Sequence, residues 1–202
     1  MKRISLLSSS FSGSTLFGIL LCQDRRFIGL GDTYLIPGVS DENEMCSCLS
    51  TVAECGFRVE LAKQLELHDL PPSMILDRQY RIPSKWISSR VGGLRALAVY
   101  KNLGRVAGYE RVYSAFLERE RGFLQSISAI GEFEYYLDGC KNLIRADILA
   151  ACDDQVQLIH LLRDPFAVLY SSATRHKSRR RSITKHLQGW ITYNIRSMRL
   201  CQ

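Results

Sequence analysis

The sequence ISLLSSSFSGSTLFGILL at residues 4–21 places a serine-rich turn between two apolar segments. The first segment predicts a buried strand over residues 4–9, and the second predicts a helix over residues 14–22. A tight turn of small residues points several backbone N–H groups at one place, and the positive end of the helix dipole adds to them. The turn therefore predicts a site for a phosphate-like anion, which favours nucleotide chemistry. A serine-rich loop without a ligand is the alternative.

The N-terminus also has features of a secretory signal peptide, because the basic pair Lys2-Arg3 precedes apolar residues. The serine cluster interrupts the apolar run too early, however, and no small-residue cleavage site accompanies the polar residues 22–26. We therefore expect no signal peptide. Seven cysteines, an odd number, favour reduced thiols and a cytoplasmic protein over a disulfide framework.

The length of 202 residues suits one domain, which we place at residues 1–202. Apolar residues make up 46% of the chain, which is typical of a globular protein. No stretch is long and uncharged enough to cross a bilayer, so we expect no transmembrane segment. The sequence leaves the oligomeric state open.

The formal net charge of +7 is concentrated in the run RHKSRRR at residues 175–181. Such a run can attract nucleic acid, an anionic membrane surface or an acidic small molecule, but it is usually a solvated segment. The run has no interleaved aromatic residues, which would favour single-stranded nucleic acid. We therefore do not expect a nucleic-acid partner.

Apolar periodicity predicts strands that alternate with helices along the rest of the chain. The predicted strands cover residues 27–31, 133–138 and 156–162, and the predicted helices cover residues 57–67, 83–101, 109–127, 142–152 and a segment that begins at Pro165. This alternation is typical of a parallel sheet with helices on both faces, so we expect a three-layer α/β/α fold. Ligands of such folds bind beyond the carboxyl ends of the strands.

The turn after the first strand is not a Walker A loop. That loop has a lysine directly after its last glycine, whereas Gly13 is followed here by Ser14. Ordinary ATP or GTP hydrolysis and nucleotide kinase activity are therefore disfavoured.

A second polar element, LLRDPFAVLYS at residues 161–171, comes at the end of the last predicted strand. Arg163 leaves the strand, and Ser171 follows about two helical turns later. A guanidinium and a hydroxyl that converge on one phosphate make selective, charge-assisted hydrogen bonds. The alternative is that Arg163 forms a weak surface pair with Asp164 and that Ser171 merely packs.

These two elements resemble the PAPS-dependent sulfotransferases of the bacterial and Golgi-type branch. In that family a loop of the form basic-Ser-Gly-Ser/Thr-Thr binds the 5′-phosphosulfate end of the donor. A later Arg-Asp/Asn-Pro motif, with a serine eight positions beyond its arginine, binds the 3′-phosphate. The matching residues here are Ser12, Gly13, Ser14, Thr15, Arg163 and Ser171. The resemblance implies a P-loop NTPase-like sulfotransferase fold, with PAPS as donor and PAP as product.

The segment GDTYLIP at residues 31–37 resembles the Gly-Glu segment of the same family. The resemblance implies that Asp32 takes the proton of the acceptor. Such a base must reach the acceptor hydroxyl, and burial near an anionic donor raises its pKa. Capping of the turn after Gly31 is the alternative.

The segment DGCK at residues 138–141 resembles the Asp-Ser-Ser-Lys segment of bacterial members. The resemblance implies that Lys141 stabilises the oxygen between phosphate and sulfur as that bond breaks. An ordinary solvated lysine at a helix start is the alternative. Trp190 and Asn194 also resemble the family, without an assignable role.

The cysteines CSC at residues 46–48 and Cys55 resemble a cysteine-rich segment of some bacterial sulfotransferases. Three thiolates can ligate zinc, but a fourth ligand and a second paired spacing are missing from the sequence. We therefore expect no metal and interpret these cysteines as buried or redox-active thiols.

The sequence departs from the family at Phe11, where the family loop has a basic residue. Loss of one such contact to a transition state lowers a rate about a hundredfold or more. The chain also stops at Gln202, before the C-terminal segments usual in the family, as in a short, truncated or degenerate member. The leading expectation is sulfuryl transfer from PAPS to a hydroxyl, or an amine, of a small-molecule, glycan or lipid acceptor. A protein that binds PAP or PAPS without turnover is the first alternative, and a basic nucleic-acid-binding module is the second.

Overall fold

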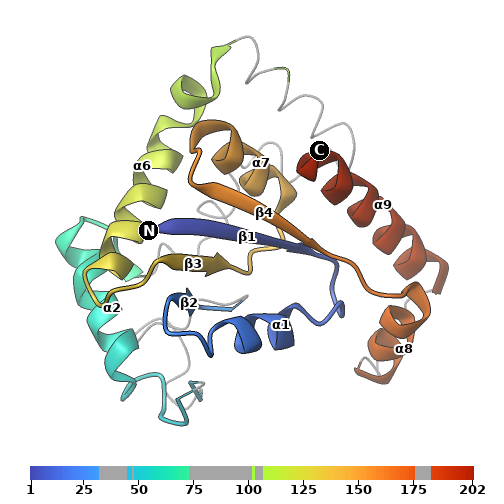
Figure 1. Ribbon diagram of the computed structural model, residues 1–202, viewed down its shortest axis with the longest axis horizontal. Helices are drawn as coiled ribbons and strands as arrows, with labels where there is room; N and C mark the ends of the chain where they lie inside the picture. Colours follow the sequence, from blue (N-terminus) through green and yellow to red (C-terminus); the bar gives the residue numbers. More distant parts are fainter. Residues whose placement is uncertain (32–44, 47, 73–101, 103–106, 176–182) are drawn as a thin grey trace.

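The computed structural model describes residues 1–31, 45–46, 48–72, 102, 107–175 and 183–202. Four parallel strands form one sheet in the spatial order β2-β3-β1-β4. These strands are β1 (Lys2–Ser8), β2 (Phe27–Gly29), β3 (Tyr135–Asp138) and β4 (Val156–Leu161). Figure 1 shows β1 in the interior of the sheet, where it pairs with β3 on one side and β4 on the other.

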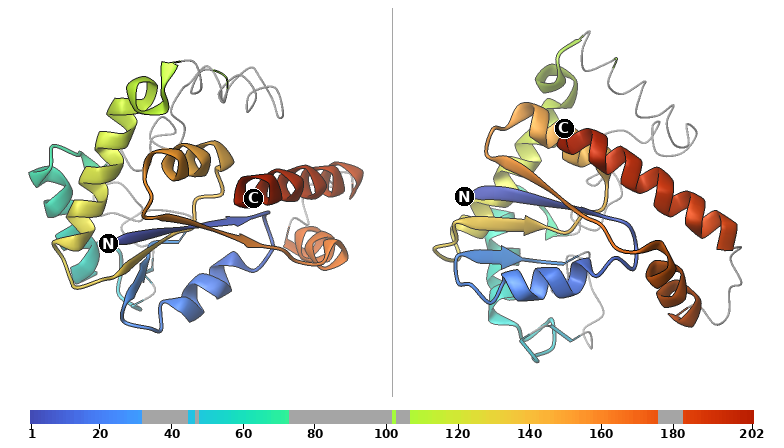
Figure 2. Two further views of the ribbon diagram at one scale, coloured as in Figure 1. Left: turned by 45° about the horizontal axis from the view of Figure 1, so that its top comes forward. Right: turned by 45° about the vertical axis from the view of Figure 1, so that its right-hand side comes forward.

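Six helices accompany the sheet in the described part of the chain, namely α1 (Ser14–Leu21), α2 (Gly56–Leu67), α6 (Tyr109–Ser128), α7 (Leu143–Cys152), α8 (Pro165–Arg175) and α9 (Ile183–Cys201). Helix α1 lies on one face of the sheet, and α7 and α9 lie on the other (Figure 2). The expected α/β fold with an all-parallel sheet is confirmed. The helix predicted at residues 83–101 lies outside the described residues. Within those residues, no helix combines the length and the apolar character needed to cross a membrane.

Alternation of side chains along β1 lets this strand pack against helices on both faces of the sheet. Ile4 and Leu6 join a cluster that includes Phe17 and Leu21 of α1. Leu7 belongs to a separate cluster with residues of α7 and α9. Because both faces are covered, β1 is almost wholly buried and fixes the position of the loop that follows it.

Helix α6 connects two parts of the core. Tyr113, Phe116 and Leu117 are buried and pack on Ile148 and Leu149 of α7. Further along the helix, Phe123 and Ile127 pack with α2 in a second cluster. The ring of Phe123 meets a tyrosine ring of β3 edge-on, with 5.5 Å between the centroids.

A buried network of four charged side chains fastens α6 and α7 to the sheet. Glu120 of α6 lies 2.7 Å from Nη1 of Arg3 on β1 and 2.8 Å from Nη2 of Arg145 on α7. Arg145 also pairs with Asp138 at the end of β3. None of the four residues is more than 2% exposed. Two cations and two anions balance one another, which offsets the cost of removing them from water.

The connections between strands diverge at the carboxyl end of β1. Ser8, the last residue of β1, lies beside Leu161, the last residue of β4. From there the chain after β1 runs through α1 toward β2, whereas the chain after β4 enters α8 (Figure 1). Open parallel sheets bind ligands where neighbouring connections run in opposite directions. The fold therefore places the candidate site between these two loops.

Candidate functional site

The loop between β1 and α1 is a compact turn with two residues in the left-handed backbone region. Phe11 has a φ of 65° and Gly13 a φ of 89°. The amide of Ser12 donates to the carbonyl of Ser9 at 3.3 Å, and the hydroxyls of these two serines lie 2.6 Å apart. Glycine takes positive φ without strain, but a bulky side chain does not. The turn therefore depends on Gly13 and stores strain at Phe11.

Helix α1 begins directly after this turn, with Gly13 as its N-cap residue. Glycine has no side chain with which to cap the helix, and no acidic residue occupies the first helical turn. The first amide groups of a helix lack acceptors within the helix, and the helix dipole makes this end positive. The start of α1 can therefore accept an anion.

Arg163 contacts the same turn from the end of β4. Its Nη1 donates to the backbone carbonyl of Phe11 at 2.9 Å, across 152 residues of sequence. Arg163 is exposed, and a guanidinium has five N–H donors, so the group can also donate to a ligand. The carboxylate of Asp164 does not form an ion pair with Arg163. It accepts a hydrogen bond from the amide of Ala167 at 2.9 Å, in the first turn of α8. The structure thus brings together the two motifs that the sequence singled out.

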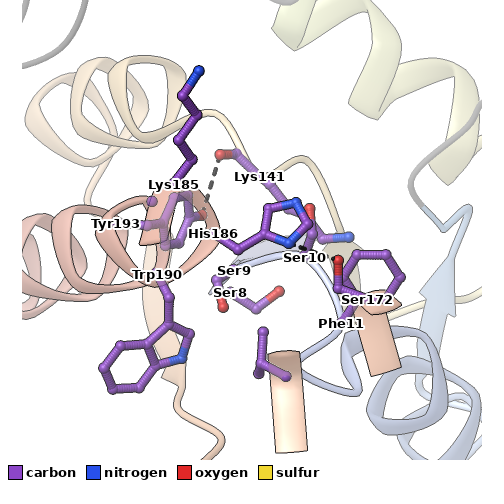
Figure 3. Close-up of a pocket in the computed structure, with 12 residues that line it drawn as sticks. Ser8, Ser9, Ser10, Phe11, Lys141, Ser172, Lys185, His186, Trp190 and Tyr193 are labelled. Carbon is purple, nitrogen blue, oxygen red and sulfur yellow. Dashed lines mark hydrogen bonds between the residues drawn. The ribbon is translucent and has the colours of Figure 1, made fainter. Parts of the chain in front are cut away.

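A cavity of about 580 Å³ opens beside the turn, a size within the usual range for small-molecule sites. Its walls come from the β1–α1 loop, the turn before α7, and helices α8 and α9 (Figure 3). The lining residues are Ser8, Ser9, Ser10, Phe11, Lys141, Val168, Ser172, Lys185, His186, Gly189, Trp190 and Tyr193.

The charge of the cavity wall is positive. Lys141 and Lys185 line it, and none of its described lining residues carries a carboxylate. Two buried polar atoms of lining residues, Oγ of Ser8 and Nε1 of Trp190, have no hydrogen-bond partner among the described residues. Buried polar groups are normally paired, so these two atoms mark places for a polar ligand or water. The wall suits an anionic ligand with an apolar, aromatic-sized part.

Two hydrogen bonds across the cavity fix the helices that form it, and both are drawn in Figure 3. Oγ of Ser172 on α8 lies 3.0 Å from Nδ1 of His186 on α9. The hydroxyl of Tyr193 on α9 donates to the backbone carbonyl of Lys141 at 3.1 Å. Helix α9 is therefore joined both to α8 and to the turn that carries Lys141.

The turn before α7 is ordered by two polar side chains. Oδ1 of Asp138 accepts from the amide of Cys140 at 3.0 Å. Oδ1 of Asn142 caps α7 by accepting from the amides of Ile144 at 3.0 Å and of Arg145 at 3.2 Å. These contacts hold the backbone on both sides of Lys141.

The structure places the predicted donor-binding residues as follows. Ser12 and Ser14 are buried within the turn and the first turn of α1, and Thr15 is exposed. Ser171 is half-buried on α8, and its neighbour Ser172 lines the cavity. Of the predicted site residues that the structure describes, Lys141 lines the cavity and the others do not.

Two predictions fall on residues outside the described part of the chain. These are Asp32, the expected base, and residues 176–181 of the basic run. Sequence reasoning did not single out Lys185, His186 or Tyr193, which α9 brings to the cavity. Their spacing could have revealed them. Lys185, Gly189 and Tyr193 are each four residues apart, so they lie on one face of a helix.

A separate cluster of three cysteines lies next to the start of α2. The sulfur atoms of Cys46, Cys48 and Cys55 all lie within 4.8 Å of one another. Burial opposes ionisation of the Cys46 thiol, but hydrogen bonds from the Cys48 backbone and from neighbouring side chains outweigh it and lower its pKa to about 6. Burial raises the pKa of the Cys55 thiol.

No protein-family model, no curated protein and no solved structure matches the chain.

Proposed function

We propose that the chain is a sulfotransferase that moves a sulfuryl group from PAPS to a hydroxyl acceptor, or less favourably to an amine. On this proposal the parallel sheet is the P-loop-like core of the sulfotransferase fold. The cavity beside the β1–α1 turn holds the donor nucleotide, and the acceptor approaches its sulfate end.

One observation carries the proposal, namely the hydrogen bond from Arg163 to the carbonyl of Phe11. It joins the turn that resembles the 5′-phosphosulfate loop to the motif that resembles the 3′-phosphate site. A cavity lined by Lys141, Lys185 and His186 lies beside this contact. Charge-assisted hydrogen bonds from cationic groups are strong contacts for the phosphate groups of such a nucleotide.

On this proposal each group of residues contacts a different part of the donor. The amides at the start of α1 receive the 5′-phosphate, because that end of the helix is positive. Arg163 and a hydroxyl of α8, Ser171 or its neighbour Ser172, hold the 3′-phosphate. Lys141 stabilises the negative charge that develops on the bridging oxygen as the bond to sulfur breaks. PAPS itself supplies the activated sulfur that the acceptor oxygen attacks.

The acceptor must lose a proton during the transfer. The family resemblance assigns this proton to Asp32. Within the described cavity, the imidazole of His186 is a second candidate for the general base. Asp32→Asn and His186→Gln separate the two, because only loss of the true base lowers kcat while PAP affinity is preserved.

Titration calorimetry with PAP tests the nucleotide site directly. We expect measurable binding, and we expect Arg163→Ala and Lys141→Ala each to weaken it by at least about tenfold, since each removes a charge-assisted contact. Arg25→Ala is the matched control, because Arg25 is an exposed arginine in the turn between α1 and β2. A screen with labelled PAPS over sugar, lipid, phenol and peptide acceptors then tests transfer. Undiminished PAP affinity in Arg163→Ala would contradict the assignment.

A binding protein without turnover is the second candidate, and Phe11 favours it. The phenyl ring lines the cavity where the family loop has a cation. In that case PAP binds, but no acceptor is sulfated, even after Phe11→Arg restores the charge. Sulfation by the unmodified protein would exclude this candidate.

A further inference from the structure

The cysteine cluster next to α2 has no role in the proposed function. Cys46 and Cys55 are buried, Cys48 is exposed, and all three are free thiols. We propose that their three thiolates bind one zinc ion, with a water molecule as the fourth ligand. The site is independent of the nucleotide cavity and of sulfuryl transfer.

Local backbone structure brings the three sulfur atoms together. A tight turn follows Cys46, whose amide donates to the carbonyl of Ser50 at 2.9 Å and whose carbonyl accepts from Leu49 at 3.0 Å. Leu49 has a φ of 69°, so the turn is held in a conformation that an apolar residue disfavours. Cys55 is the N-cap residue of α2, which places its sulfur at a fixed helix end.

The distances suit a tetrahedral ion. Zinc–sulfur bonds of about 2.3 Å at tetrahedral angles separate the sulfur atoms by about 3.8 Å. The sulfur atoms here lie within 4.8 Å of one another, so each pair closes by no more than about 1 Å on binding. No fourth Cys, His, Asp or Glu joins the group among the residues that the structure describes. The exposed side of Cys48 leaves the fourth position open to water.

Arg58 supplies a second, independent observation. It lies in the first turn of α2 and is 7% exposed, and its side chain hydrogen-bonds the Cys46 sulfur, while its Nη1 is buried without a partner among the described residues. No ion pair joins it to a carboxylate within the described residues. A buried cation at the positive end of a helix requires a nearby anion. Three thiolates around a divalent ion carry one net negative charge, which the guanidinium balances.

Metal binding explains the whole cluster better than a disulfide does. A disulfide would use two of the three thiols and leave the third unexplained. Binding needs no oxidant, because the thiols only release protons as the ion enters. The ion would also tie Cys46 and Cys48 to the start of α2, and so to the core that α2 forms with α6.

The test uses the full, untagged chain purified with a reductant and stripped of metal by a chelator. Titration with Zn²⁺ against a chromophoric competitor gives stoichiometry and affinity. We expect one ion per chain, and we expect Co²⁺ to produce thiolate charge-transfer bands and the intense visible bands of a tetrahedral site. Cys48→Ser removes an exposed ligand without a packing change. It should lower zinc affinity at least about tenfold, because even the loss of a residue that only supports a metal ligand lowers affinity by about that much.

Two further variants sharpen the result. Cys201→Ser changes an exposed cysteine on α9, away from the cluster, and should leave zinc affinity unchanged. Arg58→Gln removes the balancing charge and should weaken zinc binding, whereas Arg58→Lys should restore part of it. The proposal is overturned if the reduced chain takes up no stoichiometric zinc, or if Cys48→Ser binds zinc as tightly as the unmodified chain.

Discussion

Glu120 and Arg145 face each other inside the molecule as a two-pronged ion pair, with Nε–Oε1 and Nη2–Oε2 both 2.8 Å. Glu120 also receives Arg3 from the central strand. One carboxylate therefore joins α6, α7 and β1. Such a group is costly to remove, because its two arginine partners remain buried without it.

Glu120→Gln should lower the free energy of unfolding by about 3 to 5 kcal/mol, since it leaves uncompensated positive charge in the interior. Urea denaturation followed by circular dichroism measures this loss. Glu118→Gln is the matched control on the same helix, because Glu118 is exposed, and should change stability by less than about 0.5 kcal/mol. If Glu120→Gln lowered the free energy of unfolding as little as Glu118→Gln does, the buried network would contribute nothing to stability.

Asn142 should contribute through its cap on α7. Asn142→Ala removes the acceptor for two helix amides and should destabilise the protein by about 1 kcal/mol. Asn142→Asp keeps the acceptor and should preserve stability. If the cap also positions its neighbour Lys141, PAP affinity should fall in the alanine variant and not in the aspartate variant. Identical behaviour of the two variants would contradict both expectations.

Gly189 allows a test of the cavity that also affects helix stability. A Cβ atom added at Gly189 would meet nothing within 4 Å, and the residue lies in α9 on the cavity wall. Gly189→Ala should raise stability by about 0.5 to 1 kcal/mol through helix propensity, measurable as a higher Tm. Gly189→Phe should fill part of the cavity and weaken PAP binding. Unaltered PAP affinity in the phenylalanine variant would place the ligand elsewhere.

Asp24 gives a prediction about pH. A hydrogen bond from the Arg26 side chain, and a further one from its backbone amide, lower the pKa of Asp24 to about 2. Because this pKa is lower than in the unfolded chain, the stabilisation is present above about pH 4 and is lost as the pH falls toward 2. Arg26→Ala should raise the pKa of Asp24, which carboxyl NMR titration detects. An unchanged titration curve would show that the pair does not persist in solution.

The sequence was sufficient to predict the central part of the fold. Alternating and helical apolar patterns located β1, α1, α2, α6, α7 and β4 to within a few residues. Helix α9 was not predicted, because two of its buried positions are the polar residues Asn194 and Ser197. These polar positions interrupt the apolar face that Tyr193 and Leu200 present to the core, so the stripe on which such predictions depend is broken.

Side-chain direction limited what could be predicted of the site. Sequence spacing selected Ser171, but residues one apart on a helix point about 100° away from each other, and Ser172 faces the cavity. The burial of Glu120 was equally hidden, because it lies within the run ERER, which is typical of a solvated helix face. Its role depends on partners that come from β1 and α7, and no local pattern encodes them.

The position of β1 between two paired strands has a consequence for how the molecule opens. Amide protons of a strand held on both edges exchange with solvent only when most of the structure comes apart. The serine turn is attached to this doubly paired strand, whereas α8 and α9 lie at the periphery (Figure 1). Partial opening should therefore detach one wall of the cavity while its floor stays folded, and deuterium uptake should appear in α9 well before it appears in β1.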